Sequence, residues 1–121
     1  DDKHTILLVE DDEDILAFNK MLLLEKGFDV IAAANGDDAQ ELLTHRLPDL
    51  IITDVMMPGR SGRELADQFR ETIPGLKVLY MSGHTGAESL RPGALPPGSR
   101  FLQKPFTLDA LVSTVRELLA P

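Results

Sequence analysis

Residues 48–54 read Pro-Asp-Leu-Ile-Ile-Thr-Asp, and this stretch decides the fold. Its apolar residues, 50–52, are continuous, whereas a strand with one face in water alternates apolar and polar residues. A continuous run of this kind is typical of a strand that is buried on both faces of a parallel sheet. Asp54 ends the stretch, so the strand is expected to deliver a carboxylate at its carboxyl end.

Similar apolar runs occur on both sides of this stretch. Residues 6–9, 30–33 and 78–81 are continuous runs, and residues 100–103, with apolar residues only at Phe101 and Leu102, are expected to form a short fifth strand. Helical spacing of apolar residues separates most of them. Five strands that alternate with helices predict right-handed βαβ units and an α/β fold, in which a parallel sheet carries helices on both faces.

The expected helices differ in how clearly the sequence marks them. The first has apolar residues at Ile15, Phe18 and Leu22, a stripe that normally faces the core. The second follows a turn and cap at residues 35–38 and is expected to close at Pro48. The third helix is expected over residues 61–73, and the last from about residue 107 through Leu119.

The segment 83–99 interrupts this alternation. It contains four glycines and three prolines, and few apolar side chains. Each proline lacks a backbone N–H donor and clashes with the preceding helical turn. We therefore expect the segment to be mostly irregular, with any helix between the fourth and fifth strands short or missing.

Length and composition restrict the class of protein. A chain of 121 residues predicts a single domain over residues 1–121, with no linker. The absence of cysteine rules out disulfides and thiolate metal sites and fits a reducing compartment such as the cytoplasm. No apolar run approaches the roughly 18 residues of a membrane span. A net charge of −8 disfavours nucleic acid and favours a divalent cation or a basic protein surface.

Polar side chains follow four of the five predicted strands. Glu10 and Asp11 follow the first strand, Asp54 the third, Ser82 the fourth and Lys104 the fifth. In open parallel sheets, ligands bind beyond the carboxyl ends of the strands, where the strand order reverses. We therefore expect these five side chains to meet at one edge of the sheet.

These residue types together suit phosphoryl transfer. Clustered carboxylates favour a hard cation with oxygen ligands, above all Mg²⁺. An aspartate at a strand end, here Asp54, is a competent nucleophile toward phosphorus and gives an acyl phosphate. Lys104 and Ser82 would then neutralise or hydrogen-bond the phosphoryl oxygens.

Taken singly, each of these features has a simpler explanation. The acidic run 10–14 suits the start of a helix, and we assign Asp12 to Asp14 to that role, with Asp14 as a capping residue. An aspartate after a strand is commonly a turn residue. The three histidines lack the spacing of zinc ligands, and the glycines form no phosphate-binding loop. The combination on successive strand ends is what favours a site.

Four stretches together resemble the receiver domain of two-component response regulators. The resemblance covers nearly the whole chain and implies a flavodoxin-like (βα)5 sandwich with a parallel sheet of order 2-1-3-4-5. That order would bring Glu10 and Asp11 next to Asp54. The stretches are Val9 to Asp12, Pro48 to Gly59, Met81 to Gly83 and Lys104 to Phe106.

The resemblance implies a phosphoacceptor and a metal site. Asp54 is similar to the phosphoacceptor, which receives its phosphoryl group from a histidine kinase or a histidine phosphotransfer protein. Asp11 corresponds to a direct Mg²⁺ ligand and Glu10 to a ligand that acts through water. The Met56 backbone carbonyl corresponds to a further ligand, and Mn²⁺ could replace Mg²⁺. Lys104 corresponds to the lysine that contacts the phosphoryl group.

The resemblance also implies a conformational switch and slow self-dephosphorylation. Ser82 corresponds to the switch hydroxyl and Phe101 to the switch aromatic residue. Pro105 corresponds to a proline that follows a cis peptide bond. The segment 83–99 departs from the family because a helix normally lies there.

Residues 78–85 and 101–107 are most similar to the receiver at the carboxyl end of hybrid sensor histidine kinases. The chain leaves no room for a DNA-binding output domain, which favours a receiver cut from a longer kinase over a stand-alone receiver. The isolated domain would then not be an enzyme, whereas its parent would be a protein-histidine kinase. We expect a monomer or weak dimer without membrane contact.

Two other functions remain open from the sequence. A pseudo-receiver would share the fold and only bind proteins, but it would normally lack Asp54, Lys104 or a member of the acidic pair. A phosphohydrolase of the haloacid dehalogenase type would share aspartate, lysine and Mg²⁺. Its nucleophile would follow the first strand with a second aspartate two positions on, which residues 10–12 do not match well.

Overall fold

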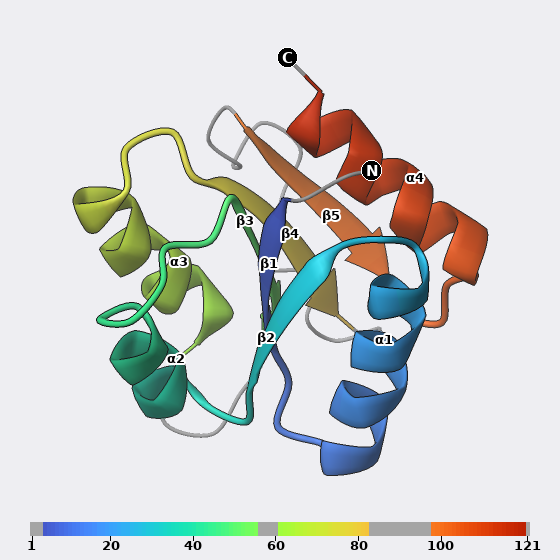
Figure 1. Ribbon diagram of the computed structural model, residues 1–121, viewed down its shortest axis with the longest axis horizontal. Coiled ribbons are helices and arrows are strands. Elements are labelled where there is room, and N and C mark those ends of the chain that lie inside the picture. Colours follow the sequence, from blue (N-terminus) through green and yellow to red (C-terminus); the bar gives the residue numbers. More distant parts are fainter. Residues whose placement is uncertain (1–3, 56–60, 83–97, 121) are drawn as a thin grey trace.

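The computed structural model describes residues 4–55, 61–82 and 98–120 (Figure 1). Its centre is a five-stranded parallel sheet in the order β2-β1-β3-β4-β5. This sheet confirms the parallel α/β fold and the strand order that the sequence predicted. The strands are β1 Thr5–Val9, β2 Asp29–Ala33, β3 Leu50–Asp54, β4 Lys77–Ser82 and β5 Ser99–Gln103.

The register of the sheet aligns the carboxyl ends of its strands. Val9 of β1 pairs with Thr53 of β3, and Asp54 pairs with Met81 of β4. Because the strands are parallel, the residues that follow them meet at one edge, which we call the carboxyl-terminal edge. The edge at which the strands begin is the amino-terminal edge.

Helices cover both faces of the sheet. The helices α1 (Glu13–Glu25) and α4 (Leu108–Leu119) lie on one face, and α2 (Gly36–Leu42) and α3 (Gly62–Thr72) lie on the other (Figure 1). Each begins at a residue whose side-chain oxygen accepts a hydrogen bond from a backbone N–H of the first turn. These residues are Asp12, Asn35, Ser61 and Thr107.

Two apolar layers hold the sheet between the helices. Ile51 and Val78 face α2 and α3, whereas Ile52 and Leu79 face α1 and α4. Successive residues of a strand point to opposite faces, so a strand with helices on both sides must be apolar throughout. This is the physical reason for the continuous apolar runs in the sequence.

The sequence pointed to the wrong face of α1. Ile15 is 39% exposed and Phe18 is 57% exposed, whereas Leu23 is fully buried and Asn19 nearly so. Met21 and Leu24 are also exposed, so α1 carries apolar residues on both its buried and its open side. Helical periodicity cannot choose between two apolar stripes, and packing against β1 and β2 makes the choice.

The second helix is shorter than the sequence suggested. It ends at Leu42, and the chain continues through turns before Pro48 instead of remaining helical up to that proline. The third and last helices agree with the expected ranges.

The expectation for segment 83–99 falls almost wholly outside the described residues. Only Gly98 and Ser99 are described, and Ser99 is the first residue of β5. Among the described residues, no helix has both the length and the apolar character required to cross a bilayer.

Candidate functional site

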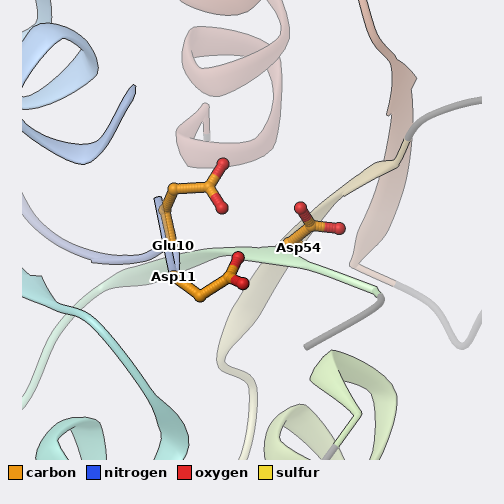
Figure 2. Close-up of side chains that lie close together, drawn as sticks. All are labelled: Glu10, Asp11 and Asp54. Carbon is orange, nitrogen blue, oxygen red and sulfur yellow. The ribbon is translucent and has the colours of Figure 1, made fainter. Parts of the chain in front are cut away.

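Three carboxylates converge at the carboxyl-terminal edge (Figure 2). Glu10 and Asp11 directly follow β1, and Asp54 is the last residue of the adjacent strand β3. One carboxylate oxygen from each residue lies within 4.8 Å of the others. Glu10 and Asp54 are buried, whereas Asp11 is exposed. The sheet order therefore brings together the acidic residues that the sequence singled out.

Lys104 lies between two of these carboxylates. Its Nζ atom is 2.8 Å from Asp54 Oδ2 and 2.9 Å from Glu10 Oε1. Lys104 follows β5, and its backbone N–H donates to the carbonyl oxygen of Ser82 at the end of β4. The next peptide bond, between Lys104 and Pro105, is cis, as expected from the sequence. The sheet thus delivers an ammonium group into the acidic cluster.

Burial and charge together shift the pKa values of two groups in this cluster. Burial raises the pKa of the Glu10 carboxyl; the ion pair with Lys104 opposes this, and the carboxyls of Asp11 and Asp54 add to it. Burial by itself would lower the pKa of Lys104, but its contacts with Asp54 and Glu10 outweigh that effect and raise it. Lys104 is therefore held in its charged form.

The two predicted switch residues lie on neighbouring strands. Ser82 is the last residue of β4, almost fully buried, and pairs in register with Gln103 of β5. Phe101 pairs with Tyr80 and packs, partly buried, against the apolar layer beneath α2 and α3. Met56, the predicted backbone ligand, lies outside the described residues.

The acidic run after β1 divides into two structural roles. The carboxylate of Asp12 accepts hydrogen bonds from the backbone N–H groups of Asp14 and Ile15, and so caps α1. Asp14 lies in the first turn and is not the capping residue, contrary to the expectation from the sequence. Two adjacent residues thus have different roles: Asp11 belongs to the acidic cluster, and Asp12 caps the start of α1.

Gly62 also belongs to the surroundings of the site, although the sequence did not indicate it. It is the first residue of α3 and lies against the backbone of Asp54. The sequence did contain one signal of a special role. Gly62 lies at the first position of a helix, although most other residues are better helix formers.

The cluster carries a surplus of negative charge. Three carboxyl groups face one ammonium group among the described residues of this edge. The carboxylates repel one another unless a further cation compensates their charge. Carboxylate oxygens are ligands that Mg²⁺ prefers. Asp54 lies at the end of β3, and an aspartate carboxylate belongs to the side-chain groups that can act as nucleophiles.

Known proteins resemble this chain in sequence over almost its whole length. Residues 6–116 match the family described as the response regulator receiver domain. The response regulator receiver protein CpdR of Brucella abortus (strain 2308) is 36% identical over 115 residues, which cover 94% of this chain and 95% of CpdR. The sensor kinase CckA of the same strain is 35% identical over 119 residues, which cover 95% of this chain but 12% of the kinase.

Solved structures show the same fold. The response regulator receiver protein from Sinorhizobium medicae WSM419 aligns with a TM-score of 0.86 and 32% identity, covering 98% of this chain and 95% of that one. The receiver domain of the hybrid histidine kinase CckA aligns with a TM-score of 0.80 and 30% identity, covering 96% and 99%. Fold, sequence similarity and the chemistry of the strand ends agree, and the chain belongs to the receiver domains of two-component response regulators.

Proposed function

We propose that Asp54 is the phosphoacceptor of this receiver domain and that the donor is a phosphohistidine on a histidine kinase or a histidine phosphotransfer protein. The contact between Asp54 and Lys104 carries this proposal. Of the two carboxylates that contact Lys104, the Asp54 side chain is 12% exposed and that of Glu10 only 2%. An incoming phosphoryl group can therefore approach Asp54 more readily than Glu10.

The proposed transfer exchanges one bond to phosphorus for another. A carboxylate oxygen of Asp54 bonds to phosphorus while the bond from phosphorus to the donor's imidazole nitrogen breaks. The product is an acyl phosphate, and the imidazole keeps the electron pair and takes up a proton. Reactions of this class depend mostly on positioning and charge neutralisation. Lys104 would neutralise one phosphoryl oxygen, and Ser82 would donate a hydrogen bond to a second.

The residues of this chain fit the Mg²⁺ that receiver domains generally bind in an acidic pocket. Glu10, Asp11 and Asp54 offer hard oxygen ligands within 4.8 Å of one another, two of them buried. We assign Asp11 and Asp54 as direct ligands, Glu10 as a ligand through water, and the Met56 backbone carbonyl as a further ligand, with Mn²⁺ as an alternative ion. When bound, the metal supplies positive charge that compensates the phosphoryl oxygens.

The signal is proposed to leave the site through Ser82 and Phe101. A phosphoryl group on Asp54 would attract the Ser82 hydroxyl at the end of the neighbouring strand. Phe101 lies on the next strand and is only partly buried, so an inward turn of its ring would bury more of it. Slow self-dephosphorylation would then reset the domain. NMR of the Phe101 ring with and without beryllofluoride tests this step, since an unchanged ring environment would contradict it.

The exposed apolar side of α1 is the proposed docking surface for the donor. Ile15, Phe18, Met21 and Leu24 form an exposed apolar ridge, which begins one turn after the Asp12 cap. The ridge therefore starts at the carboxyl-terminal edge, next to the proposed phosphoacceptor. A donor must present its histidine at that edge, and an apolar helix surface beside it would extend the contact.

The relatives of this chain differ in how much of their own length it spans. The chain spans 12% of the CckA sensor kinase, 51% of the regulator TcrX of Mycobacterium tuberculosis and 95% of CpdR. We propose that residues 1–121 are a single receiver domain of a hybrid histidine kinase, whose kinase activity would belong to the parent. We further propose a cytoplasmic domain that is a monomer or weak dimer and binds neither nucleic acid nor membrane.

The main rival is a pseudo-receiver that only binds proteins. Asp54, Lys104 and both acidic residues are present in this chain, which favours phosphotransfer over that alternative. The haloacid dehalogenase-type phosphohydrolase is disfavoured further, because the family and strand order are those of receivers.

Chemical phosphorylation tests the proposed function. The protein is incubated with Mg²⁺ and acetyl phosphate, and the modified peptide is mapped by mass spectrometry after borohydride trapping of the acyl phosphate. We expect one adduct, on Asp54, that disappears in Asp54→Ala. An adduct of equal yield in Asp54→Ala would contradict the assignment, and inertness of the wild-type protein would support the pseudo-receiver.

A further inference from the structure

The first residue of α3 touches the backbone of the strand that carries Asp54. The N–H of Gly62 donates to the carbonyl oxygen of Val55, with an N···O distance of 2.9 Å. A Cβ atom on Gly62 would lie 2.0 Å from the carbonyl oxygen of Asp54 and 2.9 Å from its carbonyl carbon. The helix therefore approaches the end of β3 more closely than any residue with a side chain permits.

The obstacle to a side chain is rigid. Real Cβ atoms essentially never come within 3.0 Å of another heavy atom, so an alanine at position 62 would force a displacement of about 1 Å. The nearest atom is a backbone carbonyl oxygen and not the end of a flexible side chain. A rotamer change cannot relieve the contact, and either α3 or the Asp54 peptide must move.

Backbone conformation does not explain a glycine at this position. Among the described glycines, those with a positive φ are Gly27, Gly75 and Gly98, so Gly62 has a conformation open to other residues. Glycine is also among the poorest helix formers, and α3 gains no stability by beginning with one. The close approach to Asp54 and to the Thr53 hydroxyl is what requires the missing side chain.

The same carbonyl group is held by a second residue. The hydroxyl of Thr53, which is fully buried, donates to the carbonyl oxygen of Asp54 at 3.1 Å. The position for a Cβ on Gly62 is also 2.9 Å from Thr53 Oγ1. Gly62 and Thr53 thus fix the orientation of the Asp54 peptide, and with it the direction of the Asp54 side chain.

We propose that Gly62 is a positioning residue for phosphorylation. By letting α3 rest against the Asp54 peptide, it aims the Asp54 carboxylate at Lys104 and at the acidic pair. The inference rests on the proposed role of Asp54 as the phosphoacceptor. A displacement of about 1 Å would disturb the 2.8 Å contact between Asp54 and Lys104, and misplacements of that size can reduce rates by about 100-fold.

A matched pair of variants in α3 separates positioning from stability. Gly62→Ala adds one methyl group against Asp54, whereas Ala66→Gly removes one from the fully buried side of the same helix. For each variant the measurements are the melting temperature, the initial rate of phosphorylation by acetyl phosphate, and Mg²⁺ affinity from an NMR titration. Wild-type protein in the same assay reports whether Asp54 accepts phosphate at all.

We expect Gly62→Ala to lower the phosphorylation rate roughly tenfold or more and to weaken Mg²⁺ binding. Ala66→Gly should stay within about twofold of the wild-type rate even if its melting temperature falls further, because it does not touch the site. A wild-type rate in Gly62→Ala, or an equal loss in both variants at equal stability, overturns the inference.

A second variant decides the question if Gly62→Ala fails to fold. Thr53→Val keeps the side-chain shape and removes the hydrogen bond to the Asp54 carbonyl. A rate lowered about threefold or more supports positioning through this peptide, and a wild-type rate overturns it.

If wild-type protein gains no adduct on Asp54, the proposed function fails and the inference falls with it. If wild-type protein is phosphorylated on Asp54 and the variants of Gly62 and Thr53 react at the wild-type rate, the positioning role of Gly62 is refuted, but the proposed function is not.

Discussion

Both edges of the sheet carry charged residues, but the two edges differ in how these residues are paired and how deeply they are buried. At the amino-terminal edge, Arg46 Nη2 lies 2.9 Å from Asp29 Oδ2 and donates to the Thr5 hydroxyl at 2.8 Å. The backbone N–H of Thr5 in turn donates to Asp49 Oδ2 at 2.8 Å. The carboxylates of Asp29 and Asp49 each accept a hydrogen bond, and the side chains that form the ion pair are about half exposed.

At the carboxyl-terminal edge, negative charges outnumber positive ones among the described residues, and two of the three carboxylates are buried. Lys104 is 25% exposed and the Glu10 side chain only 2%, and Asp11 and Asp54 add two further carboxyl groups. Bringing like charges together at a buried site lowers stability unless another charge compensates them. The contacts at the amino-terminal edge therefore stabilise the fold, whereas the arrangement at the carboxyl-terminal edge is explained by its proposed role in phosphorylation.

Removing the ammonium group from the carboxyl-terminal edge should have the largest effect. Lys104→Met leaves the acidic cluster without its cation, so phosphorylation by acetyl phosphate should fall by about 100-fold. The fold should lose about 2 kcal/mol, because two charge-assisted hydrogen bonds disappear. Phosphorylation rates and denaturant unfolding check both parts. A rate within threefold of wild type would mean that Lys104 only balances charge.

Asp11 should matter more for phosphorylation than Asp14, which belongs to the same acidic run. Asp11→Asn removes a proposed metal ligand, so Mg²⁺ affinity and phosphorylation should fall roughly tenfold or more. The fold should gain a little stability, because the change relieves repulsion with Glu10 and Asp54. Asp14→Asn, in the first turn of α1, is the control and should leave the rate unchanged. Equal losses in both variants, or full activity in excess chelator, would contradict the metal site.

Charge on the α1 ridge should affect only phosphorylation by a protein donor. Phe18→Asp should reduce transfer about tenfold from a histidine kinase that is first shown to phosphorylate wild-type protein. The rate with acetyl phosphate should not change, because Phe18 does not contact the cluster. Leu47→Asp is the matched control, since Leu47 is 59% exposed and lies at the amino-terminal edge. If both variants slow protein transfer equally, α1 is not the docking surface.

Breaking the amino-terminal network should have a small effect on stability and none on chemistry. Arg46→Ala removes an exposed ion pair and a hydrogen bond, so we expect a loss of at most about 1 kcal/mol. Thermal melts and phosphorylation rates measure the two consequences separately. A change in phosphorylation rate above twofold would show that the two edges of the sheet are coupled.

The smallest expected effect is a loss of stability at alkaline pH, which comes from Lys104 at the carboxyl-terminal edge. The pKa of Lys104 lies above its ordinary value of 10.5, so its contribution to stability is complete below pH 10.5 and is lost as pH rises through the folded-state pKa. Burial also raises the pKa of Tyr80, which destabilises the fold over the same pH range.

Comparing Tyr80→Phe with the double variant Tyr80→Phe, Lys104→Met separates these titrations. The single variant should keep part of the alkaline loss of stability in denaturant unfolding, and the double variant should keep less. Identical pH profiles for the two proteins would show that the ion pairs of Lys104 do not contribute to the pH dependence.

Much of the fold was readable from the order of residues. Continuous apolar runs such as residues 50–52 require burial on two faces, and a parallel sheet between helices is the architecture that provides it. The polar residues at the strand ends then follow, because parallel strands end at one edge. Local chemistry also marked the helix starts at Asn35 and Ser61, whose side chains satisfy backbone donors within three residues.

Other features depended on contacts between distant parts of the chain. Lys104 and Glu10 are 94 residues apart, and only the position of each strand in the sheet brings their charged atoms together. Helical spacing could not tell the buried side of α1 from its exposed side, because both are apolar and the strands decide which one they cover. The sequence also could not indicate the role of Gly62. The lack of a side chain at this position matters because α3 lies against the Asp54 carbonyl, and only the tertiary structure shows that contact.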